Sequence, residues 1–518
     1  MAPRIKNRLR DSLGLLFFIG IFVLLVGKYF LPDQLIQGAR RMANEITMNV
    51  LFLQTKAMTF FDSSLQARAQ AKEDARAIPV LVYHGLPRFD DSEVTRSRFR
   101  DQMFALKRDG WNTVSLEEFY DFMYNNAELP EKSFLLTFDD GIRTSWKYAD
   151  PVLKALDYKA VMFIITSTSA VDGSVYYLSR DEVEKMIESG RWKIQSHGHE
   201  AHFLIPIDEK GTLGHFLSNL AWLDQEQRME TIEEYRERIR KDFEISKEAI
   251  ESFGVTSLAF AFPFGDFGQN TINLPDAEKE VEQQIKPVFP LADFFQFWAS
   301  QGFTFNYPIE YSSDDFRLRR ISVRSDWSGQ ELVDYLSRGE EKYLPYVDSF
   351  EIQRGWIDIW GDQVFEHEGM TISASEQTTG GLSFLDGAYS WTSYRFESEV
   401  VVEQGLSVSL IGRYRDVNRY ASCTFHENAV LIQYQSSDIE KTIARKNMPV
   451  FNRDESFRPY QHIDGQVITC GINGDPIISA VLPEGEIAPS GGVGIKTWDP
   501  LIDNASVHAL WVSVSQID

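Results

Sequence analysis

Short apolar runs alternate with helical patterns between residues 79 and 346. Runs of this length that end at turn residues are typical of buried parallel strands, and the segments between them space their apolar residues as helices do. The expected strands are Pro79–Tyr83, Phe134–Phe138, Ala160–Ile165, Trp192–Ile194 and Ser257–Phe262, and the expected helices include Phe99–Arg108, Leu116–Asn125, Tyr148–Leu156 and Arg180–Glu188. This alternation predicts an α/β domain whose parallel strands are joined by crossover helices.

A further helix is expected at Thr231–Phe253, where apolar residues recur at helical spacing and Gly254 provides a stop. We interpret its apolar stripe as core packing and not as a site. His215 lies in the loop before this helix. It is expected to be a plain surface histidine, with a place at the border of a substrate groove as the alternative.

Beyond about Val347 the pattern changes to alternating apolar and polar positions separated by Gly, Asn and Asp turns. The expected strands include Tyr394–Val402, Leu406–Tyr414, Tyr420–His426, Ala429–Tyr434, Gln466–Ile472 and His508–Val514. This predicts an all-β jelly-roll sandwich over residues 347–518, similar in pattern alone to concanavalin-like and laminin-G-like domains. We expect a carbohydrate-binding domain in which Trp498 and Tyr414 are candidate platforms for sugar rings, core packing being the alternative.

The N-terminal residues have the pattern of a membrane signal. Four basic residues precede an apolar run from Leu13 to Gly27, and Lys28 and Pro32 stand where a cleavage site would need small residues. We therefore expect residues 1–32 to form a basic cytoplasmic tip and a single-pass transmembrane anchor. The rest of the chain would lie on the periplasmic, extracytoplasmic side of a bacterial inner membrane.

A helical linker is expected over residues 33–78, between the anchor and the α/β domain at 79–346. Its segment Ile46–Phe61 is rich in apolar residues but contains Asn49, Gln54 and Lys56. This segment is too polar to predict a second membrane span. It is expected either to lie on the membrane surface or to pack against the α/β domain.

Composition adds two constraints. The chain has 518 residues, of which 43% are hydrophobic, and this allows two or three domains with sizeable cores. Its formal net charge of −24 argues against nucleic acid as a partner, because the phosphates would be repelled.

Both cysteines, Cys423 and Cys470, fall in the predicted sandwich. Outside the cytoplasm they could form a disulfide if their strands are neighbours, or remain two buried thiols.

Candidate chemistry stands at the ends of two predicted strands. Asp139 and Asp140 follow the run Phe134–Phe138, and S-H-G-H-E-A-H follows the run Trp192–Ile194. Parallel α/β folds carry their sites at such carboxyl ends. One carboxylate and two imidazoles suit a divalent metal of the zinc, cobalt or nickel kind, and the second carboxylate is then free to act as a base. The alternative is that the aspartates form only a turn and the histidines a solvated loop.

Three segments resemble the motifs of a known family. T-F-D-D-G at Thr137–Gly141, S-H-G-H-E-A-H at Ser196–His202 and F-A-F-P-F-G at Phe260–Gly265 resemble the first three motifs of the polysaccharide deacetylases, the NodB-homology family of metal-dependent carbohydrate esterases. P-V-L-V-Y-H-G at Pro79–Gly85 resembles the opening strand of one branch. The resemblance extends from about Pro79 to Gly339. It implies a distorted, incomplete (β/α) barrel that removes N-acetyl groups from a polysaccharide.

The resemblance assigns roles to the clustered residues. Asp140 and His197 resemble metal ligands, and Asp139 resembles the general base that takes a proton from the attacking water. The histidine spacing of a branch that includes the poly-N-acetylglucosamine deacetylases of exopolysaccharide export selects His202 as the third ligand. His199 is the alternative ligand, or a residue that lines the substrate groove.

The third motif would complete the site. By the same resemblance, the backbone amide of Phe264 holds the tetrahedral oxyanion, and Pro263 fixes the turn at the substrate. Two features of the family are absent. Ala261 stands where an arginine commonly orients the base, and Arg319, Arg320 and Arg324 are candidate substitutes, a basic strand edge being the ordinary explanation for them.

The second absent feature is a late L-x-H motif, whose histidine protonates the leaving amine in many members. His84, at the end of the first strand, is the candidate general acid or groove residue, and a histidine that caps a core strand is the alternative.

Together these observations predict a membrane-anchored, extracytoplasmic polysaccharide N-deacetylase that uses a divalent metal, zinc first, with cobalt or nickel as alternatives. Its expected partners are an N-acetylated polysaccharide, the membrane, and components of exopolysaccharide synthesis or export. Two rival functions remain. One is a catalytically silent sugar-binding protein on the same barrel, which the two absent features favour; the other is a small-molecule amidase.

Overall fold

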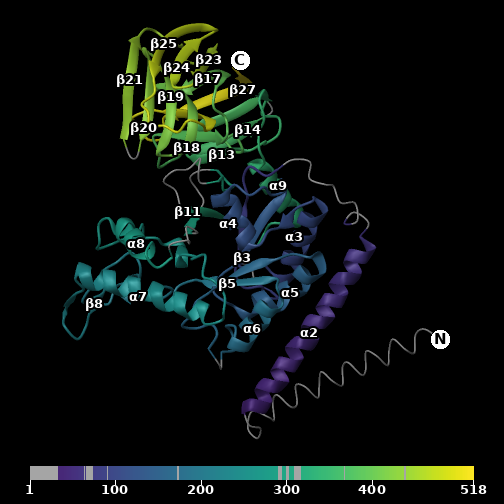
Figure 1. The fold of residues 1–518 in the computed structure, drawn as a ribbon. Helices are drawn as coiled ribbons and strands as arrows, with labels where there is room; N and C mark the ends of the chain where they lie inside the picture. The colour runs from purple at the N-terminus through teal and green to yellow at the C-terminus, as the bar shows by residue number, and fades with distance from the viewer. Residues whose placement is uncertain are drawn as a thin grey trace.

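The computed structural model describes residues 33–62, 65, 74–89, 92–171, 174–289, 295–298, 303–308, 317–366, 368–436 and 439–517. Figure 1 shows an α/β domain in the middle of the molecule, an antiparallel sandwich at one end of it, and a long helix along its side. The predicted order of an α/β domain followed by a β sandwich is confirmed. The domain boundaries themselves stay predictions.

An all-parallel sheet forms the centre of the α/β domain. Its strand order is β10-β11-β1-β3-β4-β5, with β2 beside β3. The strands are β1 (Val80–Tyr83), β2 (Asn112–Thr113), β3 (Ser133–Phe138), β4 (Ala160–Ile164), β5 (Trp192–Ser196), β10 (Phe295–Trp298) and β11 (Arg317–Ser322). Strands β1, β3 and β4 are buried at every position, which is why they read as unbroken apolar runs. The finer description of this sheet as an incomplete barrel stays a prediction.

Helices begin where the sequence offers capping residues. Ser115, Thr231 and Ser328 each cap a helix together with a glutamate three residues later, in reciprocal capping boxes. The helices of this domain are α3 (Arg96–Arg108), α4 (Leu116–Asn125), α5 (Arg143–Leu156), α6 (Arg180–Glu188), α7 (Ile232–Glu251), α8 (Ala277–Ile285) and α9 (Gly329–Gly339). All the predicted helices of this domain are present in the described residues.

The prediction of a strand at Ser257–Phe262 was wrong. Phe260 makes only an isolated parallel bridge with Ser196. The reason is the side chain of Gln195, whose Oε1 accepts from the backbone N–H groups of Leu258 and Ala259, both at 2.7 Å. A side-chain amide therefore takes the hydrogen bonds that a neighbouring strand would have taken, and the segment runs beside β5 without a ladder.

The chain between β5 and β10 forms a separate layer beside the sheet. It contains the hairpin of β6 (Leu204–Pro206) and β7 (Leu213–His215), the hairpin of β8 (Trp222–Leu223) and β9 (Arg228–Met229), helices α7 and α8, and the short 3-10 helix η2 (Pro263–Gly265). This layer has its own apolar core, which includes Tyr235, Ile239, Phe243 and Phe260. The predicted core stripe of α7 is therefore confirmed.

The long helix α2 (Asp33–Phe61) packs along α5, as Figure 1 shows. Lys147 of α5 donates to Asn44 at 2.8 Å, and Lys185 of α6 pairs with Glu45 at 2.5 Å. Of the two expectations for this segment, packing against the α/β domain is thus confirmed. Within the described ranges we find no helix that is both long and apolar enough to cross a bilayer. The predicted anchor at residues 1–32 lies outside these ranges.

Two antiparallel sheets form the C-terminal sandwich. One has the order β14-β15-β27-β17-β23-β24-β25, with β12 beside β27 and β22 beside β17, and the other has the order β13-β16-β26-β18-β19-β20-β21. The strands are β12 (Tyr346–Asp348), β13 (Trp356–Trp360), β14 (Asp362–Glu366), β15 (Gly369–Ser373), β16 (Gly380–Leu385), β17 (Tyr394–Gln404), β18 (Ser407–Asp416), β19 (Arg419–His426), β20 (Ala429–Ser436), β21 (Ile439–Asn447), β22 (Ser456–Phe457), β23 (Pro459–Asp464), β24 (Val467–Ile472), β25 (Asp475–Val481), β26 (Gly492–Trp498) and β27 (Ser506–Gln516). The alternating pattern is clearest in β17, where every second residue from Tyr394 to Val402 is buried in the core between the sheets.

Tyr414 is not a sugar platform, contrary to one of the two expectations for it. Its ring is fully buried and stacks on Phe384 with the ring centroids 4.5 Å apart, so it belongs to the core. Trp498 is 39% exposed, and its role in sugar binding stays a prediction.

Cys423 and Cys470 form a disulfide. Cys423 lies in β19 and Cys470 in β24, which belong to opposite sheets, so the bond joins the two sheets across the core and not two neighbouring strands. It closes a loop with a sequence separation of 47 residues.

Replacing both cysteines with alanine is expected to lower the free energy of unfolding of the sandwich by about 2–4 kcal/mol, because the unfolded chain loses its cross-link. Urea unfolding followed by circular dichroism measures this difference. A reducing agent should shift the midpoint of the parent protein and leave that of the double variant unchanged. Equal midpoints for the parent and the double variant under oxidising conditions would contradict the assignment.

Candidate metal centre

Strand β3 presents two adjacent carboxylates at its carboxyl end. Asp139 is 1% exposed and its backbone N–H donates to the carbonyl of Tyr83, so it continues the sheet. Asp140 and Gly141 then both adopt left-handed backbone conformations, with φ of 69° and 70°. A side chain at Gly141 would collide with Ser169, whose Oγ lies 2.2 Å from the position of an added Cβ. The sharp turn thus separates the directions of the two carboxylates.

The histidine segment follows β5 and forms a loop over the same edge of the sheet. Three successive backbone N–H groups, those of His199, Glu200 and Ala201, donate to the buried carboxylate of Asp242 on α7 at 3.0, 2.6 and 3.2 Å. Burial raises the pKa of Asp242, and these three donors act in the opposite direction. The Asp242 carboxylate, through these three hydrogen bonds, fixes the backbone conformation of the loop.

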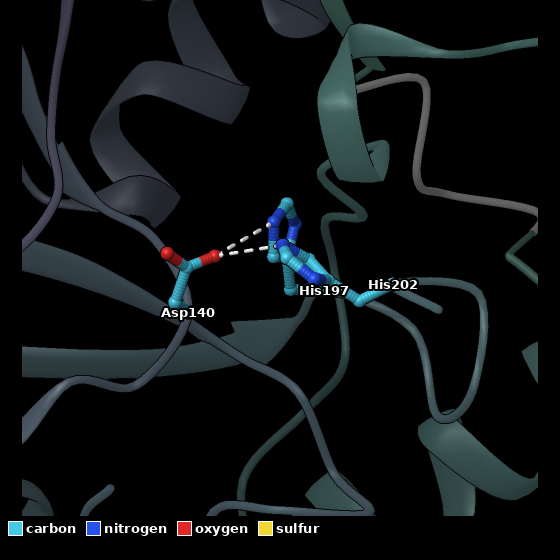
Figure 2. Close-up of side chains that lie close together, drawn as sticks. All are labelled: Asp140, His197 and His202. Atoms are coloured by element: carbon cyan, nitrogen blue, oxygen red, sulfur yellow. Dashed lines mark ion pairs between the residues drawn. The ribbon is translucent and has the colours of Figure 1, made fainter. Parts of the chain in front are cut away.

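Asp140, His197 and His202 converge at this point. The Oδ1 atom of Asp140 lies 3.4 Å from Nε2 of His197 and 3.1 Å from Nε2 of His202, as Figure 2 shows. Burial alone would raise the pKa of Asp140, but hydrogen bonds from the two imidazoles outweigh it and hold this pKa well below the usual range. These three residues are a group that could hold a metal ion, with their ligand atoms all within 4.8 Å of one another.

The two separations between Asp140 and the imidazoles are those that a tetrahedral ion needs. Zinc–nitrogen and zinc–oxygen distances of about 2.0–2.1 Å imply ligand atoms about 3.3 Å apart at tetrahedral angles. The separations of 3.1 and 3.4 Å from Asp140 Oδ1 agree with this value. Two neutral imidazoles and one carboxylate are donors that suit zinc, cobalt or nickel, and three protein ligands leave a coordination position for solvent or substrate.

The orientation of His197 is set by its second ring nitrogen. Nδ1 of His197 lies 2.8 Å from the carbonyl oxygen of Ala261. Since a carbonyl can only accept, Nδ1 carries a proton, and this hydrogen bond holds the ring with Nε2 towards Asp140. The segment that failed to form a strand therefore supplies a backbone acceptor that orients a ligand.

Asp139 is held by Arg320 of β11. The guanidinium donates to both carboxylate oxygens, with Nη1–Oδ1 at 2.8 Å and Nη2–Oδ2 at 2.6 Å, and the two side chains are 5% and 1% exposed. Burial would raise the pKa of Asp139, but the positive charges of Arg320 and His197 outweigh it, so this pKa lies below its usual value. Asp139 Oδ2 lies 4.0 Å from His197 Nε2, directly beside the ligand cluster.

Of the three arginines that the sequence offered for this place, the structure brings only Arg320 to Asp139. Arg319 donates to the carbonyl of Phe303 at 2.8 Å, and Arg324 pairs with Asp326 on the exposed surface. Arg320, from β11, is thus the arginine that pairs with Asp139, and its substitution for the arginine of the family's third motif stays a prediction.

The other predicted residues lie near the cluster but outside it. Nδ1 of His199 lies 3.0 Å from Thr166 Oγ1, and His199 is not one of the clustered donors. His84 follows β1, and its charge contributes to the lowered pKa of both Asp139 and Asp140, so it lies close to the two carboxylates.

Pro263 and Phe264 belong to η2. Pro263 is buried, whereas Phe264 is 43% exposed and has a left-handed backbone with φ of 58°. The ring of Phe264 lies 4.6 Å from that of His202. The third motif therefore lies against the metal cluster. The roles of these residues and of His84 and His199 are treated under the proposed function.

Asp242 is the residue that sequence reasoning missed. The apolar stripe of α7 was assigned to core packing, and Asp242 lies on that buried face, three residues after Ile239. A carboxylate among apolar positions of a helix must have a buried partner, and this was the signal available in the sequence.

The fold and the site together define an α/β domain with a candidate metal centre at the carboxyl edge of a parallel sheet. Residues 126–278 match the family model described as polysaccharide deacetylase, and this part of the chain is a polysaccharide deacetylase domain. The match contains the first three motifs and all three clustered donors.

Comparisons with individual proteins point to one branch. The poly-β-1,6-N-acetyl-D-glucosamine N-deacetylase of Escherichia coli K12 is 28% identical over 186 residues, which are 33% of this chain and 28% of that protein. The protein of the same name from Staphylococcus epidermidis is 26% identical over 206 residues, 39% of this chain and 67% of that protein. The chain thus spans little more than a quarter of the E. coli relative.

Among solved structures, a de-N-acetylase from Aggregatibacter actinomycetemcomitans is 20% identical to this chain. It covers 50% of this chain and 99% of its own length, with a TM-score of 0.41.

Replacing Arg320 with methionine is expected to lower the free energy of unfolding by about 3–5 kcal/mol, because the Asp139 carboxylate would remain buried without its partner. Chemical unfolding with urea measures the loss. Adding Asp139→Asn to the same chain should restore a large part of it, since the buried charge is then gone.

Arg324→Met is the matched control, because Arg324, four residues after Arg320, forms only an exposed pair with Asp326. This variant should unfold at the same urea concentration as the parent protein. If Arg320→Met and Arg324→Met lower the free energy of unfolding equally, the buried Asp139–Arg320 pair contributes no more to stability than the exposed pair does.

Proposed function

We propose that this chain is a metal-dependent hydrolase that removes N-acetyl groups from an amino-sugar polysaccharide. The observation that carries the proposal is the convergence of Asp140, His197 and His202, with the Asp139–Arg320 pair directly beside them, inside a polysaccharide deacetylase domain. A carboxylate kept ionised next to a candidate metal centre is the arrangement that hydrolysis of an amide by water requires.

Asp140, His197 and His202 would hold the ion, with zinc as the first candidate and cobalt or nickel as alternatives. When bound there, such an ion polarises the acetyl carbonyl and makes water more acidic. Asp139 accepts a proton from the attacking water. Arg320 keeps the Asp139 carboxylate ionised and fixes both of its oxygens, so that the base does not turn away.

The remaining roles are the ones that the family resemblance implies. The water oxygen bonds to the acetyl carbon, the backbone amide of Phe264 donates to the resulting oxyanion, and the buried Pro263 holds the turn that aims this amide. The carbon–nitrogen bond then breaks, acetate leaves, and His84 gives a proton to the sugar amine. His199 lines the groove beside the reacting group. These assignments to Phe264, Pro263, His84 and His199 are part of the proposal.

The substrate that we propose first is a poly-β-1,6-N-acetylglucosamine. It is supported by the names of the E. coli and S. epidermidis relatives, each similar to part of this chain. We further propose that residues 1–32 anchor the chain in a bacterial inner membrane with the domain on the extracytoplasmic side. There it would work with components of exopolysaccharide synthesis or export. The basic tip and the apolar run of residues 1–32 support this placement.

The test is acetate release from β-1,6-linked, chitin-like and peptidoglycan-derived N-acetylglucosamine oligomers, with and without a chelator. The parent protein is expected to release acetate, most rapidly from the β-1,6-linked oligomer. The chelator should abolish release, and added zinc should restore it. Asp139→Asn should lower kcat by roughly 10²–10⁴-fold, because the base is lost while the fold is kept.

His202→Ala should lose chelator-sensitive activity because one ligand is missing. Asp276→Asn, at the start of α8, and His426→Ala, at the end of β19 in the sandwich, are the matched controls and should act like the parent, because neither residue belongs to the cluster. Binding of oligomers without any acetate release would support the silent sugar-binding alternative. Release from N-acetylglucosamine monomer alone would support the small-molecule amidase.

A further inference from the structure

The two imidazoles of the candidate metal centre are held in different ways. Nδ1 of His197 has a backbone carbonyl partner at 2.8 Å, so its ring cannot rotate without losing a hydrogen bond. His202 lies in the loop after β5, with 25% of its side chain exposed, and none of the described residues forms a hydrogen bond with its Nδ1. Apart from the 3.1 Å contact of its Nε2 with Asp140, the ring of His202 therefore lacks the second polar partner that His197 has.

His202 lies at one end of a row of three rings. The centroids of His202 and Phe264 are 4.6 Å apart with an interplanar angle of 38°, and those of Phe264 and His215 are 5.0 Å apart at 64°. Both separations fall in the range in which aromatic rings attract one another. The three rings come from three segments: the loop after β5, η2 and strand β7.

The backbone supports this row. Leu204, two residues after His202, pairs with His215 in the β6–β7 hairpin, so the loop that carries the ligand is tied to the strand that carries the third ring. The carbonyl of His215 accepts from Asn219 Nδ2 at 3.1 Å. Nδ1 of His215 is buried and has no hydrogen-bond partner among the described residues. Its ring contacts the ring of Phe264.

We propose that Phe264 and His215 are positioning residues that hold the His202 imidazole so that its Nε2 faces Asp140. This inference rests on the candidate metal centre of the proposed function. Phe264 would then act twice: its amide towards the oxyanion, and its ring towards the ligand. His215 closes the row from the far side and keeps the Phe264 ring in place. The row replaces the hydrogen bond that orients His197, because packing can fix a ring as well as a polar partner can.

The test is zinc binding to the full-length apoprotein, measured by calorimetry in competition with a chelator of known affinity. His215→Ala and Phe264→Ala are each expected to weaken zinc binding roughly tenfold, as loss of a ligand's supporting partner does. The double variant should bind no more weakly than Phe264→Ala alone, because both residues act through one row. Cobalt loaded into the same variants should show an altered visible absorption band.

His215→Phe keeps a ring in this position and should bind zinc within about twofold of the parent. Leu213→Ala, a change at an exposed position of the same strand, is the matched control and should also bind like the parent. The inference is overturned if the alanine variants bind zinc like the parent, if their effects add, or if His215→Phe loses as much affinity as His215→Ala.

Failure of the proposed function would look different. If the parent protein binds zinc but releases no acetate, the proposed deacetylase function is contradicted, and the positioning role of Phe264 and His215 is not. If the parent releases acetate and the variants have unchanged zinc affinity and an unchanged cobalt spectrum, only the positioning role is contradicted.

Discussion

Two carboxylates stand next to each other at a buried strand end, and each remains ionised there because it has its own hydrogen-bonding partner. Asp139 has Arg320, and Asp140 has the two imidazoles of His197 and His202. The left-handed turn at Asp140 is what keeps the two partnerships separate, because it points adjacent side chains in different directions. Like charges at this distance would otherwise force one of the pair to take up a proton. A base and a metal ligand can therefore occupy consecutive positions of one chain.

The segment of the third motif runs beside the edge of the sheet and contacts the site, but it does not add a strand to the sheet. Gln195 takes the hydrogen bonds of the backbone at Leu258 and Ala259, and so the following residues are free to run at an angle to β5. Ala261 can then turn its carbonyl to His197, and Phe264 can bring its ring to His202. In a regular strand, these backbone groups would have formed hydrogen bonds with β5. The irregular backbone at the sheet edge is thus a requirement of the site.

The parts that the sequence predicted well are those governed by periodicity. The parallel strands, their crossover helices and the sandwich follow from apolar patterns, and the meeting of the two carboxylates with the histidine segment follows from the rule that parallel strands end at one edge. The choice of His202 over His199 came from the family resemblance alone. The choice of Arg320 did not follow, because it depends on the register of β11 beside β1, which places Ile321 opposite Leu81. Single-sequence patterns carry no register across 200 residues. The strand expected at Ser257–Phe262 failed for a similar reason, since a distant side chain competes for its hydrogen bonds.

The loop that bears His202 depends on more of the chain than its own seven residues. Its backbone is fixed from one side by Asp242 of α7, and its ring lies against Phe264 of η2. Both come from the layer inserted between β5 and β10, which has its own apolar core. Because that layer folds around its own core, it can hold the loop at the position that a longer histidine spacing needs, and the sheet does not have to change. Which histidine reaches Asp140 therefore depends on the inserted layer as well as on the motif. For this reason the local sequence pattern left both His199 and His202 as candidate ligands.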